Sequence, residues 1–310
     1  MSSTFSIQIL GSSSAVPTRD RNQTALILDL GQESILFDAG EGVQKQFILF
    51  NVKPHKITHV VISHLHPDHF IGLIGMLCSW GLLGRHNSLT IVSPEGLREI
   101  IEVQLKHAGI TLHYPLKWVH PLSKNDSLVL ETKRFILKSY LLHHRVPCFG
   151  FKLTETAHER RLLPEMLEGS SLPYKAYNLM KQGDDFTDEN GKVHSYLDYT
   201  SDAPHARSFV YFTDTSVMYS HASFIEGADV LYHDSTFMHD IAEKARDTGH
   251  STSCEAAKFA KEANVKRLLL GHFSSRYGNL KVLENEARTI FKESYLATEG
   301  QIFEVNNKPL

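Results

Sequence analysis

The chain has 310 residues, of which 42% are hydrophobic and 22% charged, and its formal net charge is −3. These values are ordinary for a globular protein, and the length allows one large domain or two medium ones. A protein that binds nucleic acid over its whole surface is usually basic, so any nucleic-acid site on this chain must be a local basic patch. The three cysteines form no CxxC pair, which fits a reducing cytoplasm and argues against a cysteine zinc site.

The N-terminal residues have neither the basic segment nor the long apolar stretch of a signal peptide. The most apolar run, residues 70–84, has 15 residues and includes four glycines. It is shorter than the ~20 residues that a membrane-spanning helix needs. We therefore expect no membrane segment, and a buried helix at this position.

Strand-like and helical patterns alternate along the first half of the chain. We expect helices at residues 41–50 and 94–107, the second opened by a proline in its first turn. The expected strands are residues 6–10, 24–30, 34–37, 58–63, 89–92, 127–131 and 135–142.

Residues 154–206 differ from the rest, because they are polar, rich in Gly, Asp and Pro, and weak in strand pattern. A loop of this length is uncommon inside a compact domain, so we expect an inserted arm with its own function. Beyond it we expect strands at residues 209–213, 229–232 and 267–270, and a helix at 253–264 capped by Ser251, Thr252 or Ser253. The alternation in both halves favours an α/β layered architecture with sheets in the middle and helices outside.

Four potential metal ligands lie within the six residues 64–69, directly after a predicted buried strand. His64 and His66 can share one direction, whereas Asp68 and His69 turn toward a second point beside it. Imidazole and carboxylate groups suit zinc or another borderline divalent ion. A polar loop with coincidental histidines is the alternative, and the density of ligands after a strand argues against it.

Four side chains cannot fill two metal sites, so further ligands must come from elsewhere in the chain. Acidic or imidazole groups also stand at the ends of five other predicted strands. Buried unpaired charges are costly, so these groups need a metal or one another. They are Asp38, His143, His144, Asp214, His233, Asp234 and His272.

This set of residues resembles that of the metallo-β-lactamase superfamily, and the resemblance covers nearly the whole chain. It implies one domain over residues 1–310, folded as a four-layer αββα sandwich with an inserted arm. It also implies two Zn²⁺ ions per subunit, with Mn²⁺ or a similar ion as the alternative. By this resemblance, one ion is held by His64, His66 and His144, the other by Asp68, His69 and His272, and Asp214 bridges them.

Shorter segments resemble the ribonuclease Z family within that superfamily. Residues 144–150 (HRVPCFG) resemble the stretch in which the ligand histidine precedes Val by two residues, which favours His144 over its neighbour His143. Residues 17–22 resemble the family's Pro-x-Lys-x-Arg-Asn loop, with Arg19 in place of Lys. Residues 233–237 resemble its His-Glu-Ala-Thr-Phe segment, with Asp234 in place of Glu. Residues 37–42, 250–252 and 271–277 resemble three further segments of that family.

This resemblance implies a zinc-dependent endoribonuclease that removes 3′ trailers from precursor tRNA, leaving a tRNA 3′-hydroxyl and a trailer 5′-phosphate. Asp68 is expected to orient or deprotonate the attacking water, and His250, oriented by Asp234, to protonate the leaving oxygen. Phosphate contacts are expected from Arg19, Arg21 and Arg276. For the Arg19/Arg21 loop the alternative is a solvated turn, and for residues 250–252 it is helix capping.

The resemblance assigns precursor-tRNA binding to the arm at about residues 154–206, and it implies a cytoplasmic homodimer. The arm lacks the family's Gly-Pro pair, so a flexible acidic insertion stays open as an alternative. Another hydrolase on the same scaffold, such as a general phosphodiesterase, a thioesterase or a lactamase, is the second interpretation of the whole chain. A non-catalytic RNA-binding or zinc-binding protein is the third, although all seven expected ligand positions are filled.

Overall fold

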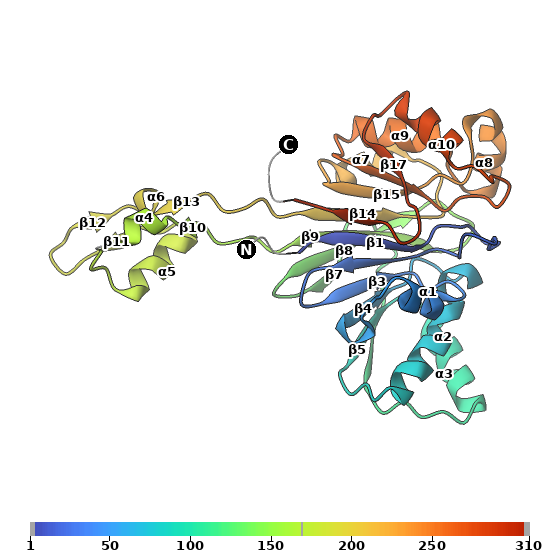
Figure 1. The fold of residues 1–310 in the computed structure, drawn as a ribbon, viewed down its shortest axis with the longest axis horizontal. Helices are drawn as coiled ribbons and strands as arrows, with labels where there is room; N and C mark the ends of the chain where they lie inside the picture. Colours follow the sequence, from blue (N-terminus) through green and yellow to red (C-terminus); the bar gives the residue numbers. More distant parts are fainter. Residues whose placement is uncertain (1–3, 169, 307–310) are drawn as a thin grey trace. The chain divides into compact units, whose positions relative to one another are not determined.

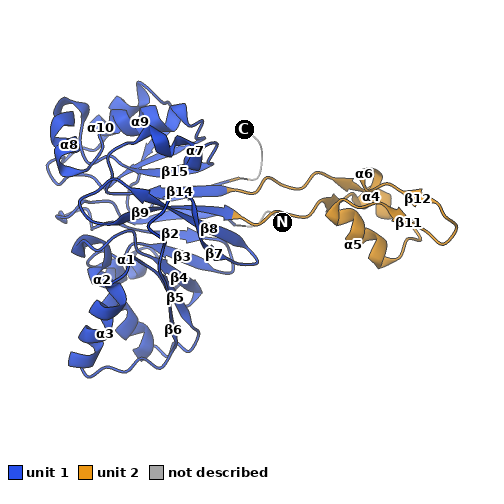
Figure 2. Ribbon diagram, turned by 180° about the vertical axis from the view of Figure 1, so that it is seen from behind, with its two compact units in different colours: residues 1–154, 208–305 blue, residues 155–207, 306–310 orange. Residues whose placement is uncertain are grey.

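A computed structural model describes residues 4–168 and 170–306. The chain divides into two compact units, which are coloured separately in Figure 2. Unit 1 comprises Met1–Thr154 and Ser208–Val305, and unit 2 comprises Glu155–Arg207 and Asn306–Leu310. Among the described residues, no helix is both long enough and apolar enough to cross a membrane.

Unit 1 contains two seven-stranded sheets. In the first sheet, β18, β1, β2 and β3 are antiparallel neighbours, and β3, β4, β5 and β6 are parallel neighbours. Its strands, in spatial order, are β18 (Ile302–Glu304), β1 (Ser6–Gly11), β2 (Ala25–Asp29), β3 (Ser34–Phe37), β4 (Ile57–Val61), β5 (Leu89–Val92) and β6 (Leu116–Val119).

The second sheet also combines both strand directions. Four of its strands, β14 to β17, are parallel, whereas β9 pairs antiparallel with β14 and β7 antiparallel with β8. Its strands, in spatial order, are β17 (Ser294–Leu296), β16 (Leu268–Gly271), β15 (Val230–Asp234), β14 (Ser208–Phe212), β9 (Cys148–Glu155), β8 (Phe135–Leu142) and β7 (Ser127–Glu131).

The two sheets pack face to face, and helices cover their outer faces (Figure 1). On β14, Phe209 and Tyr211 enter the core between the sheets, while Val210 and Phe212 face the helices, because successive side chains of a strand point to opposite faces. Phe37 of the first sheet meets Phe209 of the second edge to face, with ring centroids 5.5 Å apart. The expected four-layer αββα sandwich is therefore confirmed.

Two groups of helices form the outer layers of unit 1 (Figure 1). The first sheet is covered by α1 (Val43–Leu49), α2 (Pro67–Leu82) and α3 (Leu97–His107), which share one apolar core with it. The second sheet is flanked by α7 (Ala222–Ile225), α8 (Ala242–Thr248), α9 (Ser253–Glu262) and α10 (Lys281–Arg288). Short 3₁₀ turns are η1 (Pro54–Lys56), η2 (Tyr219–His221) and η3 (His239–Ile241).

The boundaries expected from the sequence hold closely in several elements and fail in others. Strands β3, β5, β7 and β8 have the expected bounds. The helix expected to begin at Pro94 begins at Leu97, because Gly96 has φ 95° and lies outside the helical region. Among the candidate caps of α9, Thr252 is the N-cap and forms a reciprocal capping box with Glu255.

Unit 2 has secondary structure of its own. Its main helix is α5 (Tyr174–Gln182), which buries Ala176 and Met180. Two small antiparallel pairs join β10 to β13 and β11 to β12. The remaining elements and strand bounds are β10 (Arg161–Leu162), α4 (Pro164–Leu167), β11 (Phe186–Thr187), β12 (Val193–His194), α6 (Tyr196–Tyr199) and β13 (Thr200–Ser201).

Candidate metal centre

The expected ligands come from the ends of strands in both sheets. The segment 64–69 follows β4 and enters α2, and His144 follows β8. Asp214 follows β14, and His272 comes directly after β16. Because β14, β15 and β16 are parallel, their carboxyl ends lie at one edge of the second sheet, which brings Asp214 and His272 together.

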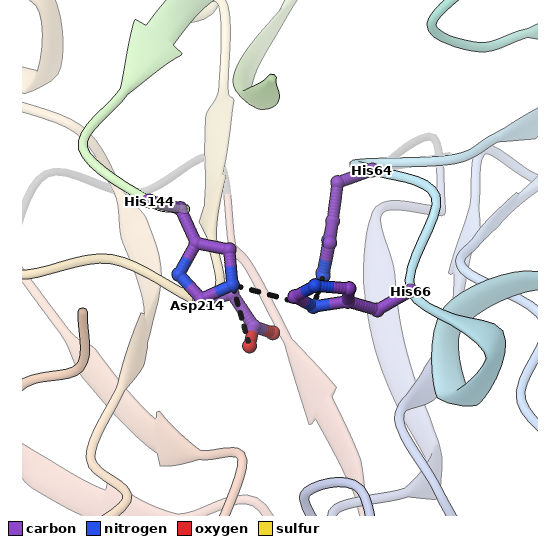
Figure 3. A group of neighbouring side chains, drawn as sticks. All are labelled: His64, His66, His144 and Asp214. Carbon is purple, nitrogen blue, oxygen red and sulfur yellow. Dashed lines mark hydrogen bonds and ion pairs between the residues drawn. The ribbon is translucent and has the colours of Figure 1, made fainter. Parts of the chain in front are cut away.

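The first cluster contains His64, His66, His144 and Asp214 (Figure 3). His64 Nε2 lies 2.9 Å from His66 Nδ1, and His144 Nε2 lies 3.3 Å from the same atom. Asp214 Oδ1 is 3.8 Å from His144 Nε2. Three imidazole nitrogens and a carboxylate oxygen thus converge as the ligands of a borderline divalent ion do.

The second cluster contains Asp68, His69 and His272, and Asp214 lies against it. His69 Nε2 is 3.2 Å from Asp68 Oδ2 and 2.9 Å from Asp214 Oδ2. His272 Nε2 is 3.1 Å from Asp214 Oδ2. One oxygen of Asp214 therefore faces the first cluster and the other faces the second, which is the geometry of a bridging carboxylate.

Two buried nitrogen atoms test whether these residues fit a metal. Nε2 of His69 and Nε2 of His272 are buried and have no hydrogen-bond partner among the described residues, although carboxylate oxygens lie within about 3 Å of each. A buried polar atom without a partner is costly, and a cation placed between nitrogen and oxygen satisfies both. The clusters therefore fit divalent metal ions.

Asp38, at the end of β3, holds ligands of both clusters in place. Its carboxylate accepts hydrogen bonds from His69 Nδ1 at 2.7 Å and from Ser63 Oγ at 2.9 Å. Ser63 Oγ in turn lies 3.0 Å from His64 Nδ1. The Tyr211 hydroxyl donates a further bond to Asp38 at 2.7 Å. Fixing Nδ1 of a ligand histidine in this way leaves Nε2 free for a metal.

A second group of hydrogen bonds surrounds Asp234, at the end of β15. His250 Nδ1 lies 2.7 Å from Asp234 Oδ2. The other carboxylate oxygen accepts from the Thr236 hydroxyl at 2.8 Å and from the Thr236 N–H at 2.9 Å. His250 also stacks on His272, with ring centroids 5.2 Å apart. The proposed proton donor thus lies beside the second cluster.

The pKa values of the histidines differ between the clusters. Burial, together with the nearby His69, holds the pKa of His64 well below its usual range, and burial also lowers the pKa values of His66 and His144. These three imidazoles are therefore neutral at pH 7, which is the form that binds a metal. Burial alone would lower the pKa of His69 too, but the Asp214 and Asp38 carboxylates outweigh it and raise that pKa.

The carboxylate of Asp68, in the second cluster, and that of Asp214, between the clusters, are both held ionised. Burial would raise the pKa of Asp68, but its contacts with His272 and His69 hold that pKa far below its usual value. For Asp214, burial is likewise outweighed by His272 and His69, and the pKa is lowered. His250 shows the opposite shift, because Asp234 overcomes the effect of burial and raises the pKa of His250 to about 9.

Three residues of the centre have left-handed backbone conformations. The φ angles are 53° for Asp38, 46° for Asp214 and 61° for His272. A non-glycine residue in this region costs on the order of 1 kcal/mol or more, and such residues gather at functional sites. Each one turns the chain sharply where a strand ends, which directs its side chain into the centre.

The three arginines expected to contact phosphate differ in their surroundings. Arg19 is exposed, and Arg276 is exposed with its guanidinium 5.1 Å from the Phe237 ring centroid. Arg21 instead donates to the backbone carbonyls of Tyr277 at 2.9 Å and Ser274 at 3.3 Å. It therefore links the loop 12–22 to the segment that follows His272, and its contact with substrate stays a prediction.

Glu299 anchors the same loop, and the sequence offered no signal for it. Its carboxylate accepts hydrogen bonds from the N–H groups of Asn22 at 2.6 Å and Ser12 at 3.3 Å. Burial outweighs these bonds and the charge of Arg21, and raises the pKa of Glu299 to about 7. The other residues that sequence reasoning missed are Ser63, Tyr211 and Thr236, of which only Thr236 lies in a segment singled out by its resemblance.

Two histidines at strand ends stay outside the clusters. His143 is exposed, whereas the neighbouring His144 joins the first cluster. His233 is fully buried and packs against α9, where its ring centroid lies 5.6 Å from that of Phe259. His233 Nδ1 lies 2.8 Å from the carbonyl oxygen of Asp234, so this histidine supports the backbone at Asp234.

Comparison with known proteins places this centre in a family. A ribonuclease Z from Cytophaga hutchinsonii is 38% identical to the chain over 309 residues, which cover 98% of this chain and 97% of that protein. The chain belongs to the ribonuclease Z family. The crystal structure of human tRNase Z, short form, superposes with a TM-score of 0.70 at 26% identity, covering 96% of this chain and 98% of that one. The expected family membership is thereby confirmed.

Two further matches concern the scaffold. The metallo-β-lactamase fold protein YhfI from Bacillus subtilis superposes with a TM-score of 0.69 at 23% identity, covering 98% of this chain and all of that one, which supports the fold alone. A family model described as Anti-Pycsar protein Apyc1 matches residues 5–112, a segment that ends before His144, Asp214 and His272. Within the ribonuclease Z family, this chain has the residues for a divalent metal site.

Proposed function

We propose that this member of the ribonuclease Z family is an endoribonuclease that removes 3′ trailers from precursor tRNA. The observation that carries the proposal is the position of Asp214, whose two oxygens face two separate clusters of ligands. Paired metal sites of this kind suit phosphodiester hydrolysis, because attacking and leaving oxygens must both be stabilised. The full-length likeness to ribonuclease Z supports RNA as the substrate.

We propose two Zn²⁺ ions per subunit, with Mn²⁺ or a similar ion as the alternative. His64, His66 and His144 would hold the first ion, and Asp68, His69 and His272 the second, with Asp214 between them. The three neutral imidazoles of the first cluster favour zinc, whereas the carboxylates of the second also suit harder ions.

The residues around the metals would carry the proton transfers. Divalent ions, when bound, activate water and neutralise charge on the phosphoryl oxygens. Asp68, whose carboxylate is ionised, would orient the attacking water and accept its proton. His250, which is protonated at pH 7, would donate its proton to the 3′-oxygen as the phosphorus–oxygen bond breaks. The products are a tRNA 3′-hydroxyl and a trailer 5′-phosphate.

Phosphate contacts flanking the centre are proposed for Arg19 and Arg276, whose guanidinium groups are exposed. Both belong to loops that meet near the second cluster, since the Phe273 N–H donates to the Ser12 carbonyl at 2.8 Å and the Ser14 N–H to the Phe273 carbonyl at 3.0 Å. Arginine binds phosphate oxygens through paired N–H donors.

Unit 2 is proposed to bind precursor tRNA. Between residues 155 and 207 the sequence has six Lys or Arg and ten Asp or Glu residues, a net charge of −4, so binding requires a local face. The exposed side of α5 offers such a local face. On it, Tyr174 is 77% exposed and stands next to Lys175, and Asn178 follows one turn later. An exposed tyrosine can stack on a base, and a lysine can contact phosphate.

We also propose a cytoplasmic homodimer. Exposed leucines at the end of α2, Leu82 at 90% and Leu83 at 80%, together with Ile48 at 78% on α1, give unit 1 apolar side chains that a second copy could cover. Sedimentation of the parent and of Leu82→Glu tests this, and a monomeric parent would contradict it. The free cysteines Cys78, Cys148 and Cys254 are compatible with a reducing compartment.

Cleavage of end-labelled precursor tRNA with Zn²⁺ or Mn²⁺, followed by mapping of both product ends, tests the proposed activity. We expect one cut near the 3′ end of the mature tRNA, a 3′-hydroxyl and a 5′-phosphate. A small chromogenic phosphodiester and a thioester, assayed in parallel, separate the alternatives. Thioester hydrolysis without RNA cleavage, or two bound metals without single-turnover cleavage of any substrate, would overturn the proposal.

A further inference from the structure

A pocket of about 410 Å³ is lined in part by residues that adjoin the first ligand cluster in the chain, and the proposed chemistry makes no use of it. Leu65, which lines the pocket, stands between His64 and His66 in the chain, and Val146 and Pro147 follow His144 by two and three residues. Two of the wall segments are therefore the segments that carry the ligands.

One backbone hydrogen bond ties a wall of the pocket to the segment that carries His64. The N–H of Phe149, another lining residue, donates to the carbonyl of Ser63 at 3.0 Å, directly before His64. Three prolines, Pro94, Pro121 and Pro147, lie in its walls, and each restricts its own backbone. The wall at Phe149 is thus held next to the residue that precedes His64.

The lining is apolar apart from two side chains. Leu65, Leu122, Val146 and Phe149 supply hydrophobic surface, while Glu95 and Ser123 are the polar residues of the lining. The lining includes no Lys, Arg or His, so the pocket does not suit a phosphate group, which the Glu95 carboxylate would also repel. A planar heterocycle fits better, because its faces are apolar and its N–H groups can donate to a carboxylate or a hydroxyl.

We propose that this pocket binds the nucleobase of a nucleotide that adjoins the scissile phosphodiester. The proposal rests on the proposed cleavage of RNA. The base inserts between Leu65, Leu122 and Val146, and Glu95 accepts a hydrogen bond from its edge. Seating the base places the neighbouring phosphate at the clusters, since the pocket wall and the first ligands share two segments of chain.

Filling the pocket tests the proposal. Leu122, which is 53% exposed, is changed to Trp, and Leu128 of β7, which is 55% exposed and outside the lining, is changed to Trp as the matched control. We expect Leu122→Trp to lower kcat/KM for precursor tRNA about tenfold or more, by analogy with the loss of base stacking. Leu128→Trp and hydrolysis of a small chromogenic phosphodiester by both variants should stay within about twofold of the parent.

Abasic substrates identify the occupant. Precursor tRNAs that lack the base on one or the other side of the cleaved bond are compared with the intact substrate. The parent should cleave one of these abasic substrates about tenfold more slowly than the intact substrate. Leu122→Trp should cleave the abasic and the intact substrate at equal rates, because the substitution and the missing base remove the same contact. Glu95→Ala should alter the rate ratio among the four bases at that position.

Several results would overturn the pocket proposal while leaving the proposed function standing. The first is that the parent cleaves both abasic substrates as fast as the intact one. The second is that the substitution Leu122→Trp and the missing base each lower the rate independently, so that their effects multiply. The third is that Leu128→Trp lowers kcat/KM for precursor tRNA as much as Leu122→Trp does. Failure of the parent itself to cleave precursor tRNA, with the chromogenic ester still hydrolysed, would overturn the proposed function and this occupant together.

Discussion

The hydroxyl oxygen of Thr236 lies 2.9 Å from Nδ1 of His272. The same hydroxyl is 2.8 Å from Asp234 Oδ1, a charged acceptor, so its single hydrogen is donated there. Oγ1 therefore accepts the Nδ1 hydrogen of His272, so the neutral form of this ring offers the lone pair of Nε2, which lies 3.1 Å from Asp214. One threonine thus connects a proposed metal ligand to the carboxylate that also orients His250.

Thr236→Val should weaken the second metal site about 10- to 100-fold, because the substitution keeps the shape of the side chain and removes the hydroxyl that orients His272. Thr236→Ser, which retains the hydroxyl, should restore most of the affinity. The measurement is the metal-to-protein ratio during titration with a competing chelator. In a protein that already carries His272→Ala, Thr236→Val should lower the metal affinity no further. If the two substitutions lowered the affinity independently, the assigned contact between Thr236 and His272 would be refuted.

Ser63→Ala provides the reciprocal control for Thr236→Val. Its hydroxyl contacts Nδ1 of His64 at 3.0 Å, so its loss should weaken the first metal site and spare the second. If both variants lost the same metal ion, the division of the ligands into two clusters would be incorrect.

Asp68→Ala should lower the rate of RNA cleavage on the order of 1000-fold or more, because Asp68 is both a proposed ligand and the proposed acceptor of the water proton. The metal-free variant and the metal-free parent should unfold within about 3 °C of each other in a thermal scan. Asp126→Ala, on an exposed residue paired with Lys138 at 3.0 Å, is the control and should cleave at the parental rate. Cleavage by Asp68→Ala at the parental rate would exclude the proposed mechanism.

His250→Ala should lower kcat for precursor tRNA about 100- to 1000-fold but should scarcely change hydrolysis of a p-nitrophenyl ester, whose leaving group needs no proton. The pKa of His250 is raised to about 9, so the donating form is present below that pH and kcat should fall as the pH rises through 9. Asp234→Asn removes the main cause of the raised pKa and should move this fall to lower pH. A high-pH limb unchanged in Asp234→Asn would argue against His250 as the donor.

Replacing residues 157–205 with a short Gly-Ser turn should separate RNA recognition from chemistry. The replacement keeps Glu155 and Arg207, whose side chains pair at 2.6 Å and whose backbones pair at 2.9 Å, so the two strands can still be joined. We expect kcat/KM for precursor tRNA to fall about 100-fold, and that of a small chromogenic phosphodiester to stay within about threefold. Parallel loss of both activities would contradict a tRNA-binding role for the arm.

Glu299→Gln should make the metal-free protein more stable at pH 8 than the parent. The pKa of Glu299 is raised from 4.5 to about 7 in the folded state, so its neutral form stabilises the fold below about pH 4.5 and that contribution is lost as the pH rises through 7. The full shift corresponds to about 3 kcal/mol, which partial exposure reduces to about 1–2 kcal/mol. Urea unfolding at pH 5 and pH 8 measures the free energy of unfolding of the parent and of Glu299→Gln. If this free energy depended on pH in the same way in both proteins, the raised pKa of Glu299 would be disproved.

Local sequence pattern predicted much of the scaffold and of the ligand set. The alternation of apolar residues located β3, β5, β7 and β8 with their observed bounds, and the dense segment 64–69 located ligands of both clusters. The pattern failed at β6, β9, β17 and β18, and at α8 and α10, none of which was expected. In β9, six of eight residues are buried, and a strand covered on both faces lacks the alternation that identifies an amphipathic one.

The sequence by itself determined which chemical groups are present and where the backbone turns to offer them, because ligand type and strand periodicity are local properties. Only the tertiary structure decided how these groups are oriented. Tyr211 and Asp38 are 173 positions apart, and Thr236 and His272 are 36 apart, yet each pair shares a hydrogen bond. Such contacts depend on the packing of one sheet on another and on the register of parallel strands, which no short segment of the chain encodes.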